Sequence, residues 1–116
     1  MRRTYHDLIV WQRAIRLAKE AYAISEGFPS AERFGLSSQM RRSAVSVASN
    51  IAEGSSRGTK REFIQFLNIA RGSLAELETQ ITIAEELGLI SDAKQIRALT
   101  DEIFGLLNGL IKSMRR

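Results

Sequence analysis

Apolar residues recur at intervals of three and four along most of the chain, which is the spacing that places side chains on one face of an α-helix. No stretch alternates apolar and polar residues in the way that a half-buried β-strand does. Clusters of glycine and serine, together with the single proline, divide the periodic stretches into four. The pattern predicts one all-α domain over residues 1–116, with helices at about 7–25, 38–56, 60–87 and 92–114.

Each predicted helix carries a main apolar stripe that is expected to face a common core. The stripe of the first helix comprises Leu8, Trp11, Ile15, Ala18 and Tyr22. The stripe of the second comprises Met40, Ala44, Val47 and Ile51. The third follows Phe63, Phe66, Ala70, Leu74, Leu77, Ile81 and Ala84, and the fourth follows Ile96, Leu99, Ile103, Leu106 and Leu110.

Local signals mark several helix ends. Thr59 and Glu62 have the spacing of a capping box, in which each residue satisfies a free amide at the start of a helix. Gly88 is expected just after the third helix, because a glycine in a left-handed conformation ends many helices. Serines are expected to cap the second and fourth helices: Ser37 or Ser38, and Ser91.

The connections between the predicted helices are short, which favours an antiparallel up-down-up-down four-helix bundle. This topology brings the N-terminus, the turn between the second and third helices, and the C-terminus to the same end. We call this the basic end, because eight cations are expected there: Arg2, Arg3, Arg57, Lys60, Arg61, Lys112, Arg115 and Arg116. The opposite end is expected to carry mixed charges.

The fourth predicted helix has a second apolar stripe, rotated from its main stripe by one residue, or about 100°. This stripe consists of Phe104, Leu107, Ile111 and Met114. The first helix repeats the pattern with Ala14, Leu17, Ala21 and Ile24. Since exposed apolar patches often mark contacts between subunits, the second stripe of the fourth helix predicts an interface in a homo-oligomer. The alternative is that both stripes widen a single core.

Two polar residues near the end of the second helix, Asn50 and Glu53, are expected to be structural. They are predicted to join this helix to the first through buried hydrogen bonds, whose loss would cost about 1–3 kcal/mol. Gly105 and Gly109 are expected to let another helix approach the fourth closely, since each otherwise weakens the helix by about 1 kcal/mol relative to alanine.

The chain has 17 Lys and Arg against 13 Asp and Glu, a net charge of +4, and most of the basic residues are arginine. The planar guanidinium suits phosphate groups, so this balance favours RNA or DNA as a partner. The alternative is a mild basic excess without such a partner. The absence of cysteine fits a reducing compartment, and no apolar run approaches the ~20 residues that cross a bilayer. A cytoplasmic protein without a membrane partner is expected.

The sequence offers few residues for catalysis. With one histidine, His6, and no cysteine, it lacks the parts of metal sites and of Ser-His or Cys-His nucleophilic pairs. The glycine-containing segment 54–61 leads into a helix but does not have the spacing of a P-loop. We therefore expect no enzyme activity and no cofactor or metal. An anion site formed by Arg57, Lys60 and Arg61 at the start of the third helix is the alternative to a solvated turn.

Five segments are distinctive in their residue order: Asp7–Gln12, Gly35–Ala44, Ser49–Gly54, Phe63–Leu67 and Gly72–Gln80. Together they resemble the four-helix-bundle family associated with intervening sequences in bacterial 23S rRNA genes. The Asn-Ile-Ala-Glu-Gly run and the double arginine after Gln39 are the most specific features. The resemblance implies a bundle, a ring-shaped homopentamer and no catalytic residues. It also implies a link to the accessory variability protein of diversity-generating retroelements, which works with a reverse transcriptase and nucleic acid.

These observations predict a non-enzymatic binding module, assembled from several copies of the chain, whose basic end contacts RNA or DNA phosphates without reading sequence. The alternative is a protein–protein scaffold in which the same end docks an acidic partner, such as a reverse transcriptase or another acidic protein.

Overall fold

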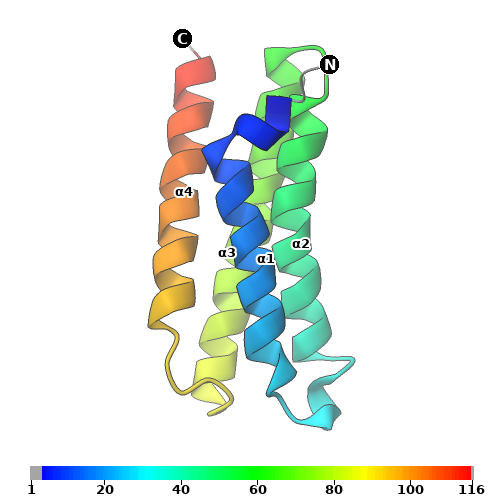
Figure 1. Cartoon of the computed structure of the whole chain (residues 1–116), viewed down its shortest axis with the longest axis vertical. Helices are drawn as coiled ribbons and strands as arrows, with labels where there is room; N and C mark the ends of the chain where they lie inside the picture. The colour runs from blue at the N-terminus through cyan, green and yellow to red at the C-terminus, as the bar shows by residue number, and fades with distance from the viewer. Residues whose placement is uncertain (1–3, 116) are drawn as a thin grey trace.

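The computed structural model describes residues 4–115 and shows four long helices in an antiparallel bundle (Figure 1). The helices are α1 (Ile9–Glu26), α2 (Leu36–Ser55), α3 (Lys60–Glu86) and α4 (Lys94–Met114). Two short 3₁₀ helices, η1 (Thr4–Asp7) and η2 (Ser30–Glu32), precede α1 and α2. The bundle measures 44 × 24 × 19 Å, and α1 and α3 each contact both α2 and α4. The expected all-α four-helix bundle is therefore confirmed.

The helix boundaries differ from the predicted ones by no more than two residues. The first helix begins at Ile9 because η1 occupies the preceding residues and Leu8 lies at the N-cap. The second begins at Leu36, with Gly35 at the N-cap, so Ser37 and Ser38 are inside the helix and do not cap it. A helix boundary is the feature that sequence patterns define least well.

The core consists of side chains from all four helices, and the stripe predicted for α2 is correct, since all four of its residues are fully buried. In α3 the buried set runs through Ala70, Leu74, Leu77, Ile81 and Ala84, as predicted. At the start of α3, Leu67 is fully buried, whereas Phe63 and Phe66 are only partly buried. The hydrophobic side chains that meet here supply most of the folding free energy.

The face that α1 turns toward the core differs from the predicted one. Ala14, Leu17 and Ala21 are fully buried, while Ile15 and Tyr22 of the predicted main stripe are 45% and 47% exposed. The two stripes are one residue apart, so helical spacing alone does not choose between them. The small side chains of Ala14 and Ala21 leave room for close helix packing, which favours their side of the helix.

The second stripe of α4 is part of the core, which corrects the expectation that it forms a subunit interface. Leu107 and Ile111 are almost completely buried, and Phe104 and Met114 are partly buried against the core. Both stripes of α4 pack within one chain because α4 lies in the groove between α1 and α3 and contacts each of them. The wider core, which was the alternative, is the correct interpretation.

Gly88 ends α3 as predicted, and the capping box at the start of α3 is present in its Thr59 half, while the Glu62 carboxylate accepts from the Thr59 hydroxyl instead of the Thr59 amide. The Thr59 hydroxyl accepts a hydrogen bond from the Glu62 amide at 3.1 Å, which fixes the first turn of α3. After α3, Gly88 adopts a φ of 74°, and the amides of Gly88 and Leu89 donate to the carbonyls of Glu85 and Ala84. This pattern is a Schellman motif, which needs a left-handed residue that glycine adopts without strain.

The start of α4 differs from the prediction. Ala93 lies at the N-cap, and the Asp92 carboxylate, rather than Ser91, accepts a hydrogen bond from the Lys94 amide at 3.0 Å. Asp92 therefore satisfies one free amide of the first turn, two residues before the helix begins.

Gly54, near the end of α2, lies directly against α3. A Cβ atom at this position would lie 2.6 Å from Cβ of Phe66 and 3.0 Å from Cδ1 of Phe63 on α3. By contrast, Cβ atoms at Gly105 and Gly109 would meet no described atom of the chain within 4 Å, so no other helix of the same chain packs closely at those two positions. The glycine that packing requires is in α2, because α2 and α3 form the most extensive helix pair.

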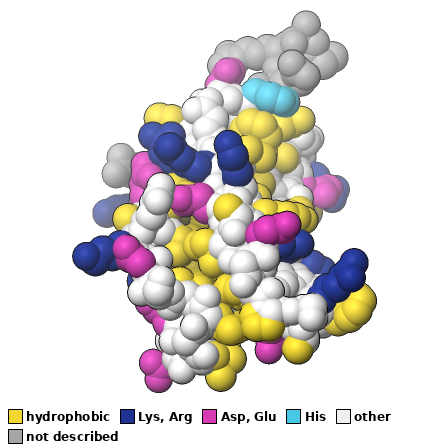
Figure 2. Space-filling view, turned by 60° about the horizontal axis from the view of Figure 1, so that its bottom comes forward, with side chains coloured by type: hydrophobic (Ala, Val, Ile, Leu, Met, Phe, Trp, Pro, Cys, Tyr) yellow, Lys and Arg dark blue, Asp and Glu magenta, His cyan; other side chains and the backbone are white. Residues whose placement is uncertain are grey.

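The topology places η1, the α2–α3 turn and the end of α4 at the same end of the bundle (Figure 1). The α1–α2 and α3–α4 connections lie at the opposite end. Figure 2 shows this opposite end turned toward the viewer, with acidic and basic side chains interspersed among apolar ones. The short connections therefore bring η1, the α2–α3 turn and the end of α4 to one end of the bundle, as predicted.

Candidate functional site at the basic end

Five of the eight cations expected at the basic end lie within the described residues. Lys60 and Arg61 begin α3, Lys112 lies in the last turn of α4, and Arg115 is its C-cap. Arg57 lies in the turn between α2 and α3. Arg2, Arg3 and Arg116 lie outside the described residues.

Arg57 is held by carboxylates and by an aromatic ring. Its guanidinium is 3.0 Å from Glu53 and 3.9 Å from Glu62, and it lies 5.0 Å from the centre of the Phe66 ring. These contacts offset its charge and fix it against the turn. Arg57 is therefore a structural residue of the turn.

Glu53 and Asn50 do not join α2 to α1, which corrects that expectation. Glu53 is exposed and pairs with Arg57 one turn later, because it is about 200° around the helix from the core residue Ile51. The amide of Asn50 donates to the carbonyl and the hydroxyl of Ser46 on its own helix, at 2.8 and 3.0 Å. Ser46 in turn bonds to Ser73 of α3 at 2.8 Å, so this network connects α2 with α3.

The other four described cations of the basic end are exposed and form no ion pair with another described residue: Lys60, Arg61, Lys112 and Arg115. Lys60 and Arg61 occupy the first turn of α3, where the free amides of the helix already create a positive potential. Only Glu62 in that turn is acidic. The fold alone gains nothing from two cations at this position, whereas an anion would be attracted by both the amides and the side chains.

An aromatic cluster lies at the same end, formed by Tyr5 and His6 of η1 and by Trp11 in the first turn of α1. The ring centres of Tyr5 and His6 are 4.3 Å apart, and Trp11 lies 4.9 Å from His6 and 5.3 Å from Tyr5. All three side chains are partly exposed. This contact of His6 was not predicted, and the only signal for it in the sequence is the Tyr-His pair that precedes the single tryptophan by five residues.

Arginines elsewhere in the bundle connect helices. The Nε atom of Arg41 on α2 donates to the Ser25 hydroxyl of α1 at 2.8 Å, and its guanidinium lies 3.2 Å from Glu26 and 4.6 Å from the ring centre of Tyr22. This cluster is the link between α2 and α1 that Asn50 and Glu53 were expected to supply. The charged pairs that attach α4 are Arg97 with Glu85 of α3, and Arg13 of α1 with Glu102.

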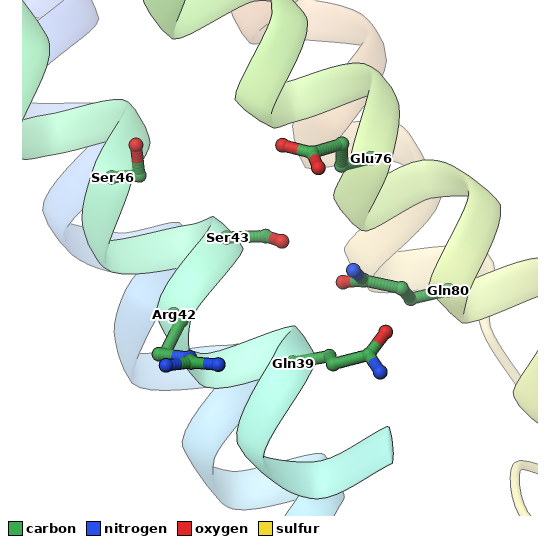
Figure 3. Close-up of a pocket in the computed structure, with 6 residues that line it drawn as sticks. All are labelled: Gln39, Arg42, Ser43, Ser46, Glu76 and Gln80. Carbon is green, nitrogen blue, oxygen red and sulfur yellow. The ribbon is translucent and has the colours of Figure 1, made fainter. Parts of the chain in front are cut away.

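A polar groove of ≈ 340 Å³ runs between α2 and α3 (Figure 3). Ser43 extends from α2 toward α3, and Glu76 and Gln80 extend from α3 toward α2. The Gln80 side-chain oxygen is buried and has no hydrogen-bond partner. Arg42 also lines the groove, but Glu76 places a negative charge on the other wall, which disfavours a phosphate here.

Residues 4–115 contain neither a metal-binding cluster nor a membrane-spanning helix. No group of three or more histidine, cysteine, aspartate or glutamate side chains in this range is arranged to hold a metal ion. None of the helices in the described range has the length and apolar character that crossing a membrane requires.

Fold and site together define a small antiparallel four-helix-bundle protein with a concentration of exposed cations at one end. Residues 6–109 match the family model of the 23S rRNA-intervening sequence protein, so the chain belongs to this family. The resemblance seen in the sequence segments is thereby confirmed.

A solved structure of the same architecture is the crystal structure of a protein of unknown function from the S23 ribosomal protein family of Bacteroides thetaiotaomicron VPI-5482. The two chains share 25% identity and superpose with a TM-score of 0.82, over 90% of this chain and 96% of the other. No curated protein matches the sequence.

Proposed function

We propose that the protein is a non-enzymatic binding module whose basic end contacts the phosphates of RNA or DNA. The observation that carries this proposal is the group of exposed cations that form no ion pair with any described residue: Lys60, Arg61, Lys112 and Arg115. They come from the start of α3 and the end of α4, which lie at the same end of the bundle (Figure 1). Phosphate contacts of this kind give affinity without sequence information.

The proposal includes assembly of several copies into a ring of five, as the family resemblance implies. Apolar side chains that remain exposed on α1 and α2 support an assembly: Ile9, Ile15, Tyr22 and Val45. Tyr22 and Val45 line one shallow groove between these helices. A ring with its basic ends on one face would sum the fields of its subunits and attract polyanions more strongly than one chain does. The mass in solution should then be about five times that of the chain, and a monomer would contradict the ring.

Charge reversal at each end of the bundle tests the proposal. Lys60→Glu with Arg61→Glu removes two cations of the basic end, and Arg33→Glu with Lys94→Glu makes the same charge change at the opposite end. All four residues are exposed and form no ion pair within the described range. Affinity for a labelled single-stranded oligonucleotide, measured by fluorescence anisotropy, should fall roughly tenfold or more for the first pair only. Equal losses for both pairs would contradict a site at the basic end.

The second candidate is a scaffold that docks another protein, and the groove of Figure 3 favours it. Its walls carry a cation and a carboxylate without ion-pair partners, Arg42 and Glu76, and the unpartnered oxygen of Gln80. Mixed charge and open hydrogen-bonding capacity suit a protein surface better than a phosphate backbone. This candidate predicts no nucleic-acid binding at low salt. An acidic partner, such as a reverse transcriptase, would dock at the basic end, while the groove would take a protein surface of mixed charge.

A further inference from the structure

We infer that the basic end takes single-stranded nucleic acid, with an unstacked base resting on the aromatic cluster of Tyr5, His6 and Trp11. This inference rests on the proposed function, because the phosphates of the same strand would lie on the neighbouring cations. The inference specifies the class of ligand: a single strand, whose bases are free to stack on a ring, is preferred over a duplex, whose bases are stacked inside.

The cluster differs from the side chains of the core in its exposure to solvent. Residues of the central core such as Leu17 and Leu67 have no exposed surface, whereas the three rings of the cluster are each partly exposed. Neighbouring rings are tilted by 35° and 47° rather than stacked face to face. A partly exposed ring therefore offers part of its π-surface to a ligand, and every nucleobase has a π-face that can stack on it.

The cluster is also held in place by the backbone around it. The Leu8 amide donates to the carbonyl of Tyr5 at 3.1 Å, and the side-chain amide of Gln12 donates to the carbonyl of His6 at 2.9 Å. These bonds attach η1 to the first turns of α1. A surface that is already ordered loses little conformational entropy when a ligand binds to it.

The position of the cluster suits a strand that also touches the cations. η1 packs against both α1 and α2, and α2 leads through the turn at Arg57 into Lys60 and Arg61. All of these elements lie at the basic end (Figure 1). Proteins that bind single strands combine a positively charged path for the phosphates with aromatic side chains for the bases. The basic end provides both parts.

One exposed aromatic side chain elsewhere provides a comparison. Phe34, in the α1–α2 connection, is 90% exposed, and the Arg33 guanidinium lies 5.7 Å from its ring centre. This ring is at the opposite end, among mixed charges, so a strand held by the cations of the basic end would not reach it. Phe34→Leu is therefore a matched control for removal of a ring from the cluster.

The experiment compares three ligands on the same oligomeric protein: an oligouridylate strand, a blunt RNA duplex of equal charge, and inorganic polyphosphate. Trp11 is the only tryptophan, so its fluorescence reports on the cluster alone. The strand should quench Trp11 and bind more tightly than the duplex. Polyphosphate should bind without quenching, because it has charge but no bases.

Variants at Tyr5 separate stacking from charge. Tyr5→Leu should weaken strand binding roughly 5- to 100-fold, leave polyphosphate binding unchanged and leave the salt dependence unchanged, because stacking releases no counterions. Tyr5→Phe keeps the ring and should bind normally, as should Phe34→Leu. Circular dichroism of each variant checks that the bundle remains folded.

The outcomes distinguish this inference from the proposed function. If strand, duplex and polyphosphate bind equally and Trp11 is not quenched, the aromatic platform is wrong while the polyanion site stands. If none of the three ligands binds, the proposed function fails and the platform fails with it. Equal effects of Tyr5→Leu on strand and polyphosphate would show that the cluster only supports the fold.

Discussion

Arg41 and Arg97, which lie toward the α1–α2 and α3–α4 connections, are each joined to a carboxylate on a neighbouring helix. At the basic end, only Arg57 among the described cations is held in this way, and its partners come from the turn itself. The other four cations there extend into solvent from the start of α3 and the end of α4. Arg41 and Arg97 thus stabilise contacts between helices, although Arg33, Arg42 and Lys94 toward the same end are also exposed and without an ion pair in the described range. The basic end differs in that none of its described cations joins α4 to a neighbouring helix through an ion pair.

This difference follows from where carboxylates lie in the sequence. Near the opposite end, glutamates at the ends of α1 and α3, Glu26 and Glu85, lie beside the arginines at the starts of α2 and α4. At the basic end, the last turn of α4 and the first turn of α3 hold one carboxylate, Glu62, which bonds to Thr59 and also lies near Arg57. Within residues 4–115, the exposed cations of the basic end thus have no ion-pair partner that an anion would have to displace.

The largest effect on stability is expected at Gly54, which brings α2 and α3 together just before the basic end. Gly54→Ala would place a Cβ atom 2.6 Å from Cβ of Phe66, so the helices must move apart. We expect a loss of about 2–4 kcal/mol in the free energy of unfolding, measured by chemical denaturation. A weaker oligonucleotide affinity should accompany it, because the separation shifts the start of α3.

Gly109→Ala is the matched control for this change. A Cβ atom there meets nothing within 4 Å, and alanine favours the interior of a helix by about 1 kcal/mol over glycine. The variant should therefore be slightly more stable than the parent protein. If Gly54→Ala were equally well tolerated, the close contact between α2 and α3 would not be a constraint on the fold.

A smaller effect is expected from Arg41, the link between α2 and α1 toward the opposite end. Arg41→Ala removes a charged hydrogen bond to Ser25, the ion pair with Glu26 and the contact with the Tyr22 ring. Ser25 keeps its bond to the Ala21 carbonyl, so no buried polar group is left without a partner. The expected loss is about 1–2 kcal/mol, because the ion pair is largely exposed and such pairs contribute little.

Arg42→Ala is the control for Arg41→Ala, since the adjacent Arg42 is exposed and forms no ion pair within the described range. It should change stability by about 0.5 kcal/mol or less. Neither variant should alter oligonucleotide affinity measured by anisotropy. A loss of affinity for Arg41→Ala without a loss of stability would contradict the division between the two ends.

Much of the fold was predictable because helical spacing and local capping signals are read from short stretches. The Thr59–Glu62 pair, Gly88 and the core face of α2 all followed from residues within a few positions of one another. The face of α1 was not predictable, because two apolar stripes lie side by side and only packing against α2 and α4 chooses between them. The same limitation placed Leu107 and Ile111 at an interface rather than in the core.

The candidate site was predictable in its position but not in its details. Short connections were sufficient to bring Lys60, Arg61, Lys112 and Arg115 to one end. The pairing of Arg57 with Glu53 had a sequence signal, since the residues are four apart, but that spacing does not tell whether the helix continues far enough for them to meet. The cluster of Tyr5, His6 and Trp11 depends on η1 turning back over α1 and α2, which no local pattern specifies.

The salt dependence of oligonucleotide binding by the unmodified protein tests the central claim most directly. If four cations per chain contact the phosphates of a single strand, affinity should fall about 50-fold between 50 and 200 mM salt, with a linear plot of log Kd against log salt concentration. Binding that does not change with salt, or no binding at the lower concentration, would contradict a phosphate-binding role for the basic end.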